Sequence, residues 1–144
     1  MNDEKYMSLA IAEAKKAMLL GDVPVGAVIV YNDKVIARSY NQKEKYQKAT
    51  YHAEILAINK ANAKLKSYHL DEATIYITKE PCLMCMGAIL SARIKKIVYG
   101  VSDKRFGTKE LANNNKFNHK CEITAGVLSE ECERLLSDFF KNLR

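Results

Sequence analysis

The sequence has no tryptophan and only two prolines, and its apolar runs all fall short of the roughly 20 residues that span a membrane. It also lacks internal repeats, low-complexity tracts and linkers rich in proline, glycine or serine. A chain of 144 residues can bury roughly 68–70% of its unfolded surface in one core, without help from disulfides. We therefore expect a single domain over residues 1–144 with no membrane partner.

Cysteine is also scarce, with four residues in the chain. The N-terminus is polar and acidic, which is not the pattern of a secretory signal. We expect a cytoplasmic protein, and in that compartment thiols stay reduced. The cysteines are therefore interpreted as free thiols or metal ligands rather than as disulfides.

The charges are unbalanced, with a formal net charge of +6 carried mainly by lysine. A basic chain favours a polyanionic partner such as nucleic acid. Many small basic proteins bind nothing anionic, however, so charge alone leaves both interpretations open.

Hydrophobic periodicity predicts helices that alternate with apolar strands. Helices are expected at 6–20, 52–64, 81–91 and from residue 129, with Pro81 in a first turn and Ser129 as an N-cap. Strands are expected at 25–31, 35–40, 73–78, 94–100 and 122–127, the first two as a hairpin. Residues 42–50 form a polar loop, and residues 102–120 are polar and basic with no clear period. This order indicates an α/β fold with helices on both faces of a sheet and a parallel pair around 74–99.

The residues suited to chemistry lie in two motifs, H-A-E at 52–54 and P-C-x-x-C at 81–85. The spacing of Cys82 and Cys85 puts both sulfurs on one face of a helix start, where unpaired N–H groups and the helix dipole favour thiolates. Two thiolates and the imidazole of His52 give a zinc ion three protein ligands. An open fourth position is typical of a catalytic zinc site.

Glu54 is predicted to transfer protons rather than to bind the metal. Residues two apart in a regular helix point to different sides, so His52 and Glu54 can face one metal only if His52 lies in the first turn. On that condition Glu54 would take a proton from a zinc-activated water and pass protons to the ring nitrogen and the departing amine.

Other interpretations of these motifs stay open at this point. A structural zinc site would need a fourth ligand, for which the candidates are His69, His119, Cys121 and Cys132. A C-x-x-C pair can also be redox-active, but such pairs usually follow the first strand of a thioredoxin-like pattern. The conjunction of H-x-E with P-C-x-x-C is far more specific, because it is the signature of the zinc nucleobase deaminases.

Over most of its length the chain resembles the bacterial tRNA-specific adenosine deaminases, which convert the wobble adenosine of a tRNA anticodon to inosine. The resemblance is carried by DVPVGAV at 22–28, Asn41, HAEI at 52–55, EPCLMCMGAI at 80–89, RI at 93–94, YG at 99–100, Asp103 and LLSDFF at 135–140. The core pattern is shared with guanine and cytosine deaminases. The tRNA enzymes are distinguished from these deaminases by a few positions, which this chain shares with them: Met84 and the segments 87–89, 93–94 and 138–140.

The resemblance implies a three-layer, cytidine-deaminase-like fold with a five-stranded mixed sheet, assembled as a homodimer. It implies one zinc ion per subunit on the three residues named above, with proton transfer by Glu54. It also implies substrate contacts by Asn41, Val25, Ala53, Pro81 and Asp103. Asn41 would hydrogen-bond the flipped base, since an amide both donates and accepts. The alternative for Asn41 is a turn residue after the second strand.

The chain departs from the family pattern where the substrate enters. Asp22 and Tyr51 stand where a glutamate and a small residue are usual, Arg105 replaces a lysine, and residues 106–115 replace a segment of small residues. The same region is basic through Lys104, Arg105, Lys109, Lys116 and Lys120. Lys104 and Arg105 are expected either to contact RNA phosphates or to lie in a solvated loop.

The last helix supplies one more candidate RNA contact. Its predicted core stripe consists of Cys132, Leu135, Leu136, Phe139 and Leu143. Phe140 lies partly off this stripe, so it is expected either to pack or to touch RNA.

Three hypotheses follow for function. The leading one is a hydrolase that uses zinc to deaminate the wobble adenosine in a tRNA anticodon stem-loop. The alternative is a deaminase of a free base or nucleoside, guanine or cytosine, which would share the metal site and differ in the substrate surface. The third is a non-catalytic, zinc-stabilised RNA-binding protein.

Overall fold

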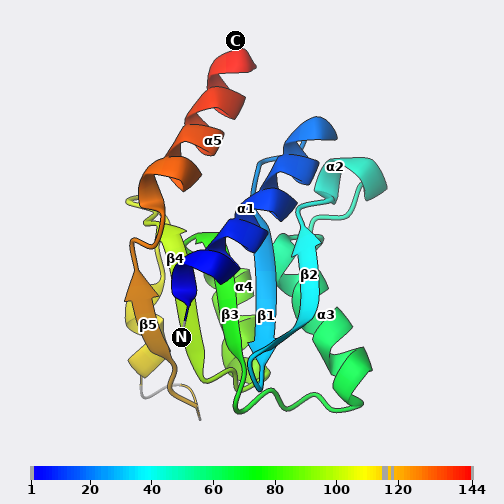
Figure 1. The fold of residues 1–144 in the computed structure, drawn as a ribbon, viewed down its shortest axis with the longest axis vertical. Helices are drawn as coiled ribbons and strands as arrows, with labels where there is room; N and C mark the ends of the chain where they lie inside the picture. The colour runs from blue at the N-terminus through cyan, green and yellow to red at the C-terminus, as the bar shows by residue number, and fades with distance from the viewer. Residues whose placement is uncertain (1, 115–116, 118, 144) are drawn as a thin grey trace.

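The computed structural model describes residues 2–114, 117 and 119–143, which are arranged around a five-stranded sheet in the order β2-β1-β3-β4-β5 (Figure 1). The strands are β1 (Gly26–Tyr31), β2 (Lys34–Tyr40), β3 (Thr74–Lys79), β4 (Lys96–Val101) and β5 (Glu122–Ala125). β1 runs antiparallel to β2 and β3, whereas β3, β4 and β5 are parallel. The predicted mixed sheet of five strands is confirmed.

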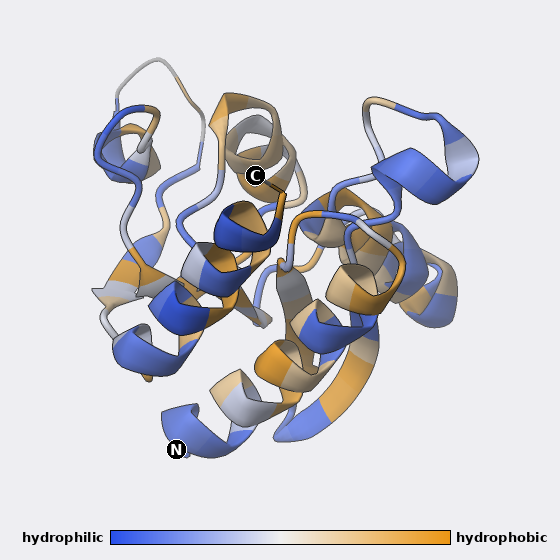
Figure 2. Ribbon diagram, turned by 90° about the horizontal axis from the view of Figure 1, so that it is seen from above, coloured by the Kyte–Doolittle hydropathy of each residue, from blue (hydrophilic) through white to orange (hydrophobic). Residues whose placement is uncertain are grey.

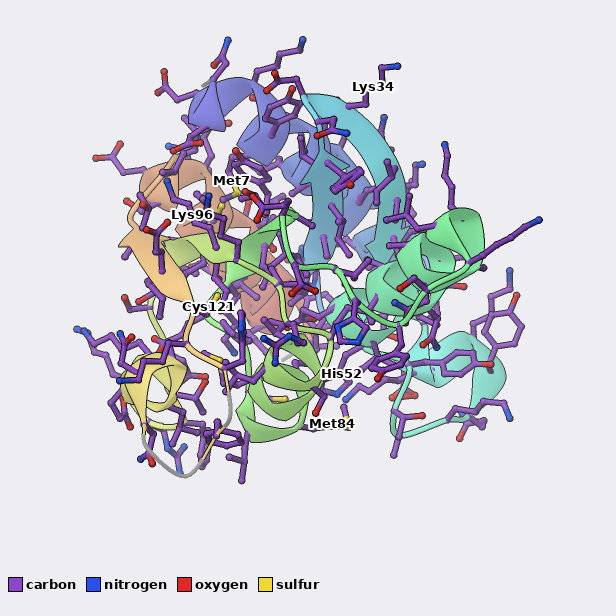
Figure 3. All side chains as sticks on the ribbon, turned by 90° about the horizontal axis from the view of Figure 1, so that it is seen from below. Met7, Lys34, His52, Met84, Lys96 and Cys121 are labelled. Atoms are coloured by element: carbon purple, nitrogen blue, oxygen red, sulfur yellow. The ribbon has the colours of Figure 1, made fainter. Side chains whose placement is uncertain are left out.

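Helices cover both faces of this sheet, which gives the three expected layers. The helices are α1 (Asp3–Leu19), α2 (Lys43–Tyr46), α3 (Ala53–Leu65), α4 (Leu83–Ser91), α5 (Ser129–Asn142) and the short 3₁₀ helix η1 (Lys109–Asn113). Two hydrophobic cores result, one beneath α3 and α4 and the other beneath α1 and α5. Figure 3 shows α1 on one side of the sheet and α3 and α4 on the other.

The side chains of β1 alternate between the two cores. Ala27 and Ile29 pack in the core of α3 and α4, whereas Val28 and Val30 pack in the core of α1. A strand that is buried on both faces is expected to be continuously apolar, as this one is. At its start, Gly26 allows close packing, because a Cβ atom there would collide with the Ala10 carbonyl oxygen of α1.

α1 has one apolar side, and Figure 2 shows hydrophobic and hydrophilic residues alternating along it. The helix begins at Asp3 rather than at the predicted residue 6, because the Asn2 side chain accepts a hydrogen bond from the Lys5 N–H at 3.1 Å and caps it. Among the described residues, no helix combines the length and apolar character that crossing a bilayer requires.

The predicted start of α4 and the predicted N-cap of α5 were wrong. α4 begins at Leu83 with Cys82 as N-cap, so Pro81 precedes the helix instead of occupying its first turn. α5 begins at Ser129, and its N-cap is Leu128 in the left-handed region (φ 52°) rather than Ser129. The helix at α4 therefore starts two residues later than predicted, whereas α5 starts at the predicted residue and only its N-cap lies one residue earlier.

Two further expectations were wrong. The loop predicted at 42–50 contains one exposed helical turn, α2, which is too short to show a hydrophobic period. The predicted core stripe of α5 stops early: Cys132, Leu136 and Phe139 are buried, but Leu143 is 67% exposed. α5 extends past the end of the sheet (Figure 1), so its last turn has no layer to pack against.

Candidate active site

His52 lies where a polar loop enters α3, and its backbone is still extended (φ −78°, ψ 151°). It is the N-cap of α3, so the regular helical rotation begins only after it. As a result the side chains of His52 and Glu54 line the same cavity. The condition set for Glu54, a histidine at the helix start, is therefore met by the geometry.

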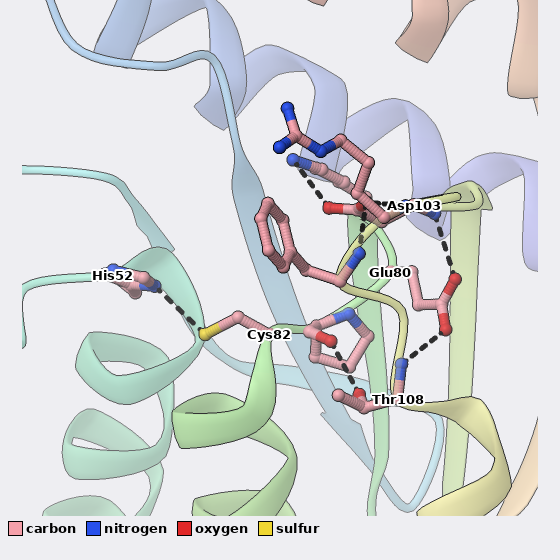
Figure 4. A network of polar contacts seen from close by, with 9 residues as sticks. His52, Glu80, Cys82, Asp103 and Thr108 are labelled. Carbon is pink, nitrogen blue, oxygen red and sulfur yellow. Dashed lines mark hydrogen bonds and ion pairs between the residues drawn. The ribbon is translucent and has the colours of Figure 1, made fainter.

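Cys82 and Cys85 come from the start of α4, where the Cys82 backbone is also extended (φ −73°, ψ 176°). The Nδ1 atom of His52 lies 3.5 Å from the Cys85 sulfur and 3.7 Å from the Cys82 sulfur. One donor atom from each residue lies within 4.8 Å of the others, and Figure 4 shows the imidazole directed at Cys82. The starts of two helices therefore bring one imidazole and two sulfurs to one point.

These donors fit a metal ion that keeps one coordination position open. Within the described ranges, they are the only group of three or more metal-binding side chains close enough to share an ion. The candidates for a fourth ligand lie elsewhere. Cys121 and Cys132 are buried in different cores. His69 pairs with an aspartate and His119 with a backbone carbonyl.

The three donors also shift one another's ionisation. The pKa of the Cys82 thiol lies well below its usual range, because the Cys85 thiol and the His52 ring hydrogen-bond to its sulfur. The same contact raises the pKa of His52 and that of Cys85. Cys82 is therefore held as the thiolate that a divalent metal requires.

Glu54 is buried against this group, with 4% of its surface exposed. Burial raises the pKa of its carboxyl group. Its Oε1 atom has no hydrogen-bond partner in the part of the chain that the structure describes. A buried acceptor without a partner is costly, and it is expected where a ligand or substrate supplies the missing partner.

The cavity beside these residues has a volume of about 170 Å³. It is lined by Val23, Val25, Asn41, Lys43, His52, Glu54, Lys79, Glu80, Cys82 and Asp103. Of the five residues predicted to contact substrate, Val25, Asn41 and Asp103 therefore lie at the cavity wall. Ala53 and Pro81 are not: both are buried next to the metal-binding residues.

Asn41 does something that neither sequence interpretation gave it. Its side-chain oxygen accepts a hydrogen bond of 2.8 Å from the Ala53 N–H, the first residue of α3. Asn41 is 5% exposed, so this bond is shielded from water. It therefore helps to set the start of the helix that carries His52 and Glu54.

Four residues of the cavity wall were missed from the sequence: Val23, Lys43, Lys79 and Glu80. Val23 and Glu80 belong to the motif stretches at 22–28 and 80–89, so their neighbours gave a signal. Lys43 and Lys79 begin a short helix and end a strand, and no local pattern distinguishes them from other surface lysines.

Comparison with known proteins bears on the chemistry of this site. A model of the MafB19-like deaminase family matches residues 1–144. The tRNA-specific adenosine deaminase of Bacillus subtilis (strain 168) is 46% identical, covering 99% of this chain and 91% of the relative. That of Haemophilus influenzae (strain ATCC 51907 / DSM 11121 / KW20 / Rd) is 42% identical, covering 99% and 85%. A structure solved in studies of A-to-I editing by tRNA:A34 deaminases has a TM-score of 0.89 at 36% identity, covering 92% of this chain and 99% of that one.

This chain belongs to the tRNA-specific adenosine deaminase family. In this deaminase, His52, Cys82 and Cys85 form a cluster of side chains that is able to hold a metal ion. The structural match also confirms the cytidine-deaminase-like α/β fold.

The candidate RNA contacts of the deaminase lie beside the metal site. A second cavity of about 580 Å³ shares Lys79 and Asp103 with the first, and Lys104 and Phe140 line it as well. Phe140 is 47% exposed. Arg105 is exposed, and its guanidinium lies 5.1 Å from the ring centre of Phe106. Lys116, another basic residue of this region, lies outside the described residues.

Proposed function

We propose that the chain uses zinc to hydrolyse the wobble adenosine of a tRNA anticodon to inosine, releasing ammonia. One observation carries the proposal: a triad of metal-binding side chains lies beside the buried carboxyl group of Glu54, whose Oε1 atom has no hydrogen-bond partner among the described residues. The 46% identity to a tRNA-specific adenosine deaminase supports tRNA as the substrate. The chain would act as a single deaminase domain in the cytoplasm.

His52, Cys82 and Cys85 would hold the zinc ion, because an imidazole and two sulfurs are ligands that zinc prefers. Nδ1 is the ring nitrogen that faces both sulfurs, so it is the atom that His52 offers. A zinc ion at this position would lower the pKa of a water molecule toward about 7.

Glu54 would carry the protons. It takes one from the attacking water and delivers it to N1 of the adenine ring while the water oxygen bonds to C6. It then takes the proton of the new hydroxyl group and gives it to the amino group on C6. The C–N bond breaks, ammonia leaves, and the ring keeps a carbonyl group at C6. Atoms balance as adenosine plus water giving inosine plus ammonia.

The direct test is editing of an anticodon stem-loop by the zinc-loaded protein. Sequencing of the reverse-transcribed RNA is expected to show an A-to-G change at the wobble position and at no other adenosine. Free guanine, cytosine and adenosine are assayed in parallel for ammonia release. Release from a free base, with the RNA unchanged, would favour the alternative function and overturn this one.

We also propose that the chain forms a homodimer and that α4 lies in its interface. Leu83 and Met84 are 67% and 37% exposed although both are apolar, and a Cβ atom added at Gly87 would meet nothing within 4 Å. Figure 3 places Met84 on the outer side of this helical layer, near His52. A second copy on this face would bury the exposed apolar groups next to the active site.

A further inference from the structure

Glu80 is a buried carboxylate that binds three backbone N–H groups of one loop. Its Oε1 atom accepts from the N–H of Asp103 at 3.0 Å, and its Oε2 atom accepts from the N–H of Thr108 at 2.8 Å (Figure 4). The Oε2 atom also accepts from the N–H of Lys109 at 3.0 Å. Glu80 is only 5% exposed. Hydrogen bonds from neutral donors to a buried carboxylate are among the stronger ones in proteins, so both ends of the 103–109 loop are held firmly.

The same loop is attached to the strand end that leads to the metal ligands. The hydroxyl group of Thr108 donates to the carbonyl oxygen of Pro81 at 2.7 Å, and Pro81 directly precedes Cys82. The N–H of Glu80 donates to the carbonyl oxygen of Val101 at 2.8 Å, which fixes the strand that enters the loop. The loop is therefore placed relative to the metal site by bonds at its start and its end.

Gly107 shows how closely the loop wraps around this carboxylate. A Cβ atom at residue 107 would lie 2.6 and 2.8 Å from the two oxygens of Glu80 and 2.5 Å from the carbonyl oxygen of Asp103. Such distances are closer than a carbon atom tolerates, so no other residue fits without displacing the loop or the carboxylate.

Between these fixed ends, the loop carries cationic and aromatic side chains of the kind that contact RNA phosphates and bases. Asp103 and Lys104 line the larger cavity, and Arg105 and Phe106 are exposed with the guanidinium over the ring. Asp103 Oδ1 accepts from the N–H groups of Arg105 and Phe106, each at 2.9 Å, which orders the tip. We call residues 103–109 the rim.

We infer that Glu80 is a positioning residue that fixes the rim for RNA binding, and that it takes no part in the chemical step. This rests on the proposed function. The Glu80 carboxylate is occupied by rim N–H groups, while the metal-binding side chains are placed by the starts of α3 and α4. Contacts between the rim and the RNA are made before and during the reaction alike, so their loss raises KM more than it lowers kcat.

The test is Glu80→Gln, which keeps the size of the side chain but removes its charge and turns an amide NH2 donor toward the backbone N–H donors of the loop. With a stem-loop substrate, KM and the dissociation constant of the RNA are expected to rise about tenfold or more, and kcat to stay within about threefold. Zinc content per chain is expected to equal that of the unsubstituted protein. Hydrogen exchange at residues 103–109 is expected to accelerate.

The matched control is Glu13→Gln. Glu13 is another buried carboxylate, 2% exposed, which binds Lys16 at 2.9 Å and Arg38 at 3.1 Å from α1 on the other side of the sheet. Its substitution is expected to lower thermal stability and leave KM unchanged. If Glu80→Gln does not fold, Gly107→Ala displaces the rim with Glu80 intact and is expected to give the same rise in KM.

The outcomes separate this inference from the proposed function. An unsubstituted, zinc-loaded protein that does not edit the stem-loop would refute the function, and the dissociation constants would still decide the role of Glu80. Unchanged RNA affinity and KM in the Glu80→Gln protein would overturn the inference. So would a loss of kcat or of zinc that accounts for the whole defect.

Discussion

Replacing Glu54 with glutamine is the sharpest perturbation of the proposed chemistry. The substitution keeps the volume of a side chain that is 4% exposed and removes its ability to accept and return a proton. A positioned acid–base group is worth about 10²–10⁴ in rate, or about 3–5 kcal/mol of transition-state stabilisation.

We expect a loss at the upper end of that range, because no other carboxyl group at the described cavity wall is able to replace Glu54. The other two carboxylates at the cavity wall are occupied: Glu80 by three backbone N–H groups, and Asp103 by two N–H groups and Lys79 at 3.2 Å. Neither is free to exchange protons with a bound base.

The assay is single-turnover editing of an anticodon stem-loop, with zinc measured on the same preparation. We expect the rate to fall about 10⁴-fold, the zinc content to stay the same and the RNA affinity to change little. Residual editing within about tenfold of the unsubstituted rate would refute Glu54 as the proton carrier. Loss of zinc would instead make Glu54 part of the metal site.

Three further results are expected. After the metal is removed with a chelator, iodoacetamide at pH 6 is expected to label Cys82 before the other cysteines, and added zinc is expected to protect Cys82. The reason is that the pKa of the Cys82 thiol is lowered, whereas burial raises the pKa of Cys121 and of Cys132 to about 12. Mass spectrometry of the labelled peptides checks this. Asn41→Ala leaves the first N–H of α3 without its buried acceptor, so we expect a loss of about 1–3 kcal/mol in urea unfolding, and full stability would contradict the contact. Met84→Glu puts a charge on the exposed face of α4, and sedimentation is expected to show monomers; an unchanged dimer would move the interface elsewhere.

The sheet and the long helices were predictable because their residues repeat with a period that burial enforces. β1 and β3 are buried on both faces, so β1 appears in the sequence as a continuous apolar run and β3 as a run of β-branched and aromatic residues. α2 and η1 were not predictable, since each is about one turn long and has at most one buried residue. The start of α4 and the N-cap of α5 were misplaced because residue preference at a cap is weaker than the tertiary packing that decides it.

The metal-binding cluster was predictable for a different reason, namely that its geometry is local. His52 and Glu54 are two residues apart and Cys82 and Cys85 three, so a helix start fixes each pair. The contacts of Glu80 are not local in this sense. They join residues 23 to 29 positions apart through backbone N–H groups, which every residue except proline possesses.

The backbone contacts of Glu80 and the local geometry of the metal-binding cluster determine which residues of this site can vary. Glu80 binds backbone N–H groups of the rim, so the side chains at 104, 105 and 106 can change without breaking these bonds. Position 107 is restricted by space, and positions 103 and 108 by the bonds of their own side chains. This chain departs from the family pattern at Arg105 and from residue 106 onward, and these positions lie within the rim or just beyond it. Substrate contacts can therefore diverge while the metal ligands and the proton carrier keep their geometry, because the two sets of residues are held by different bonds.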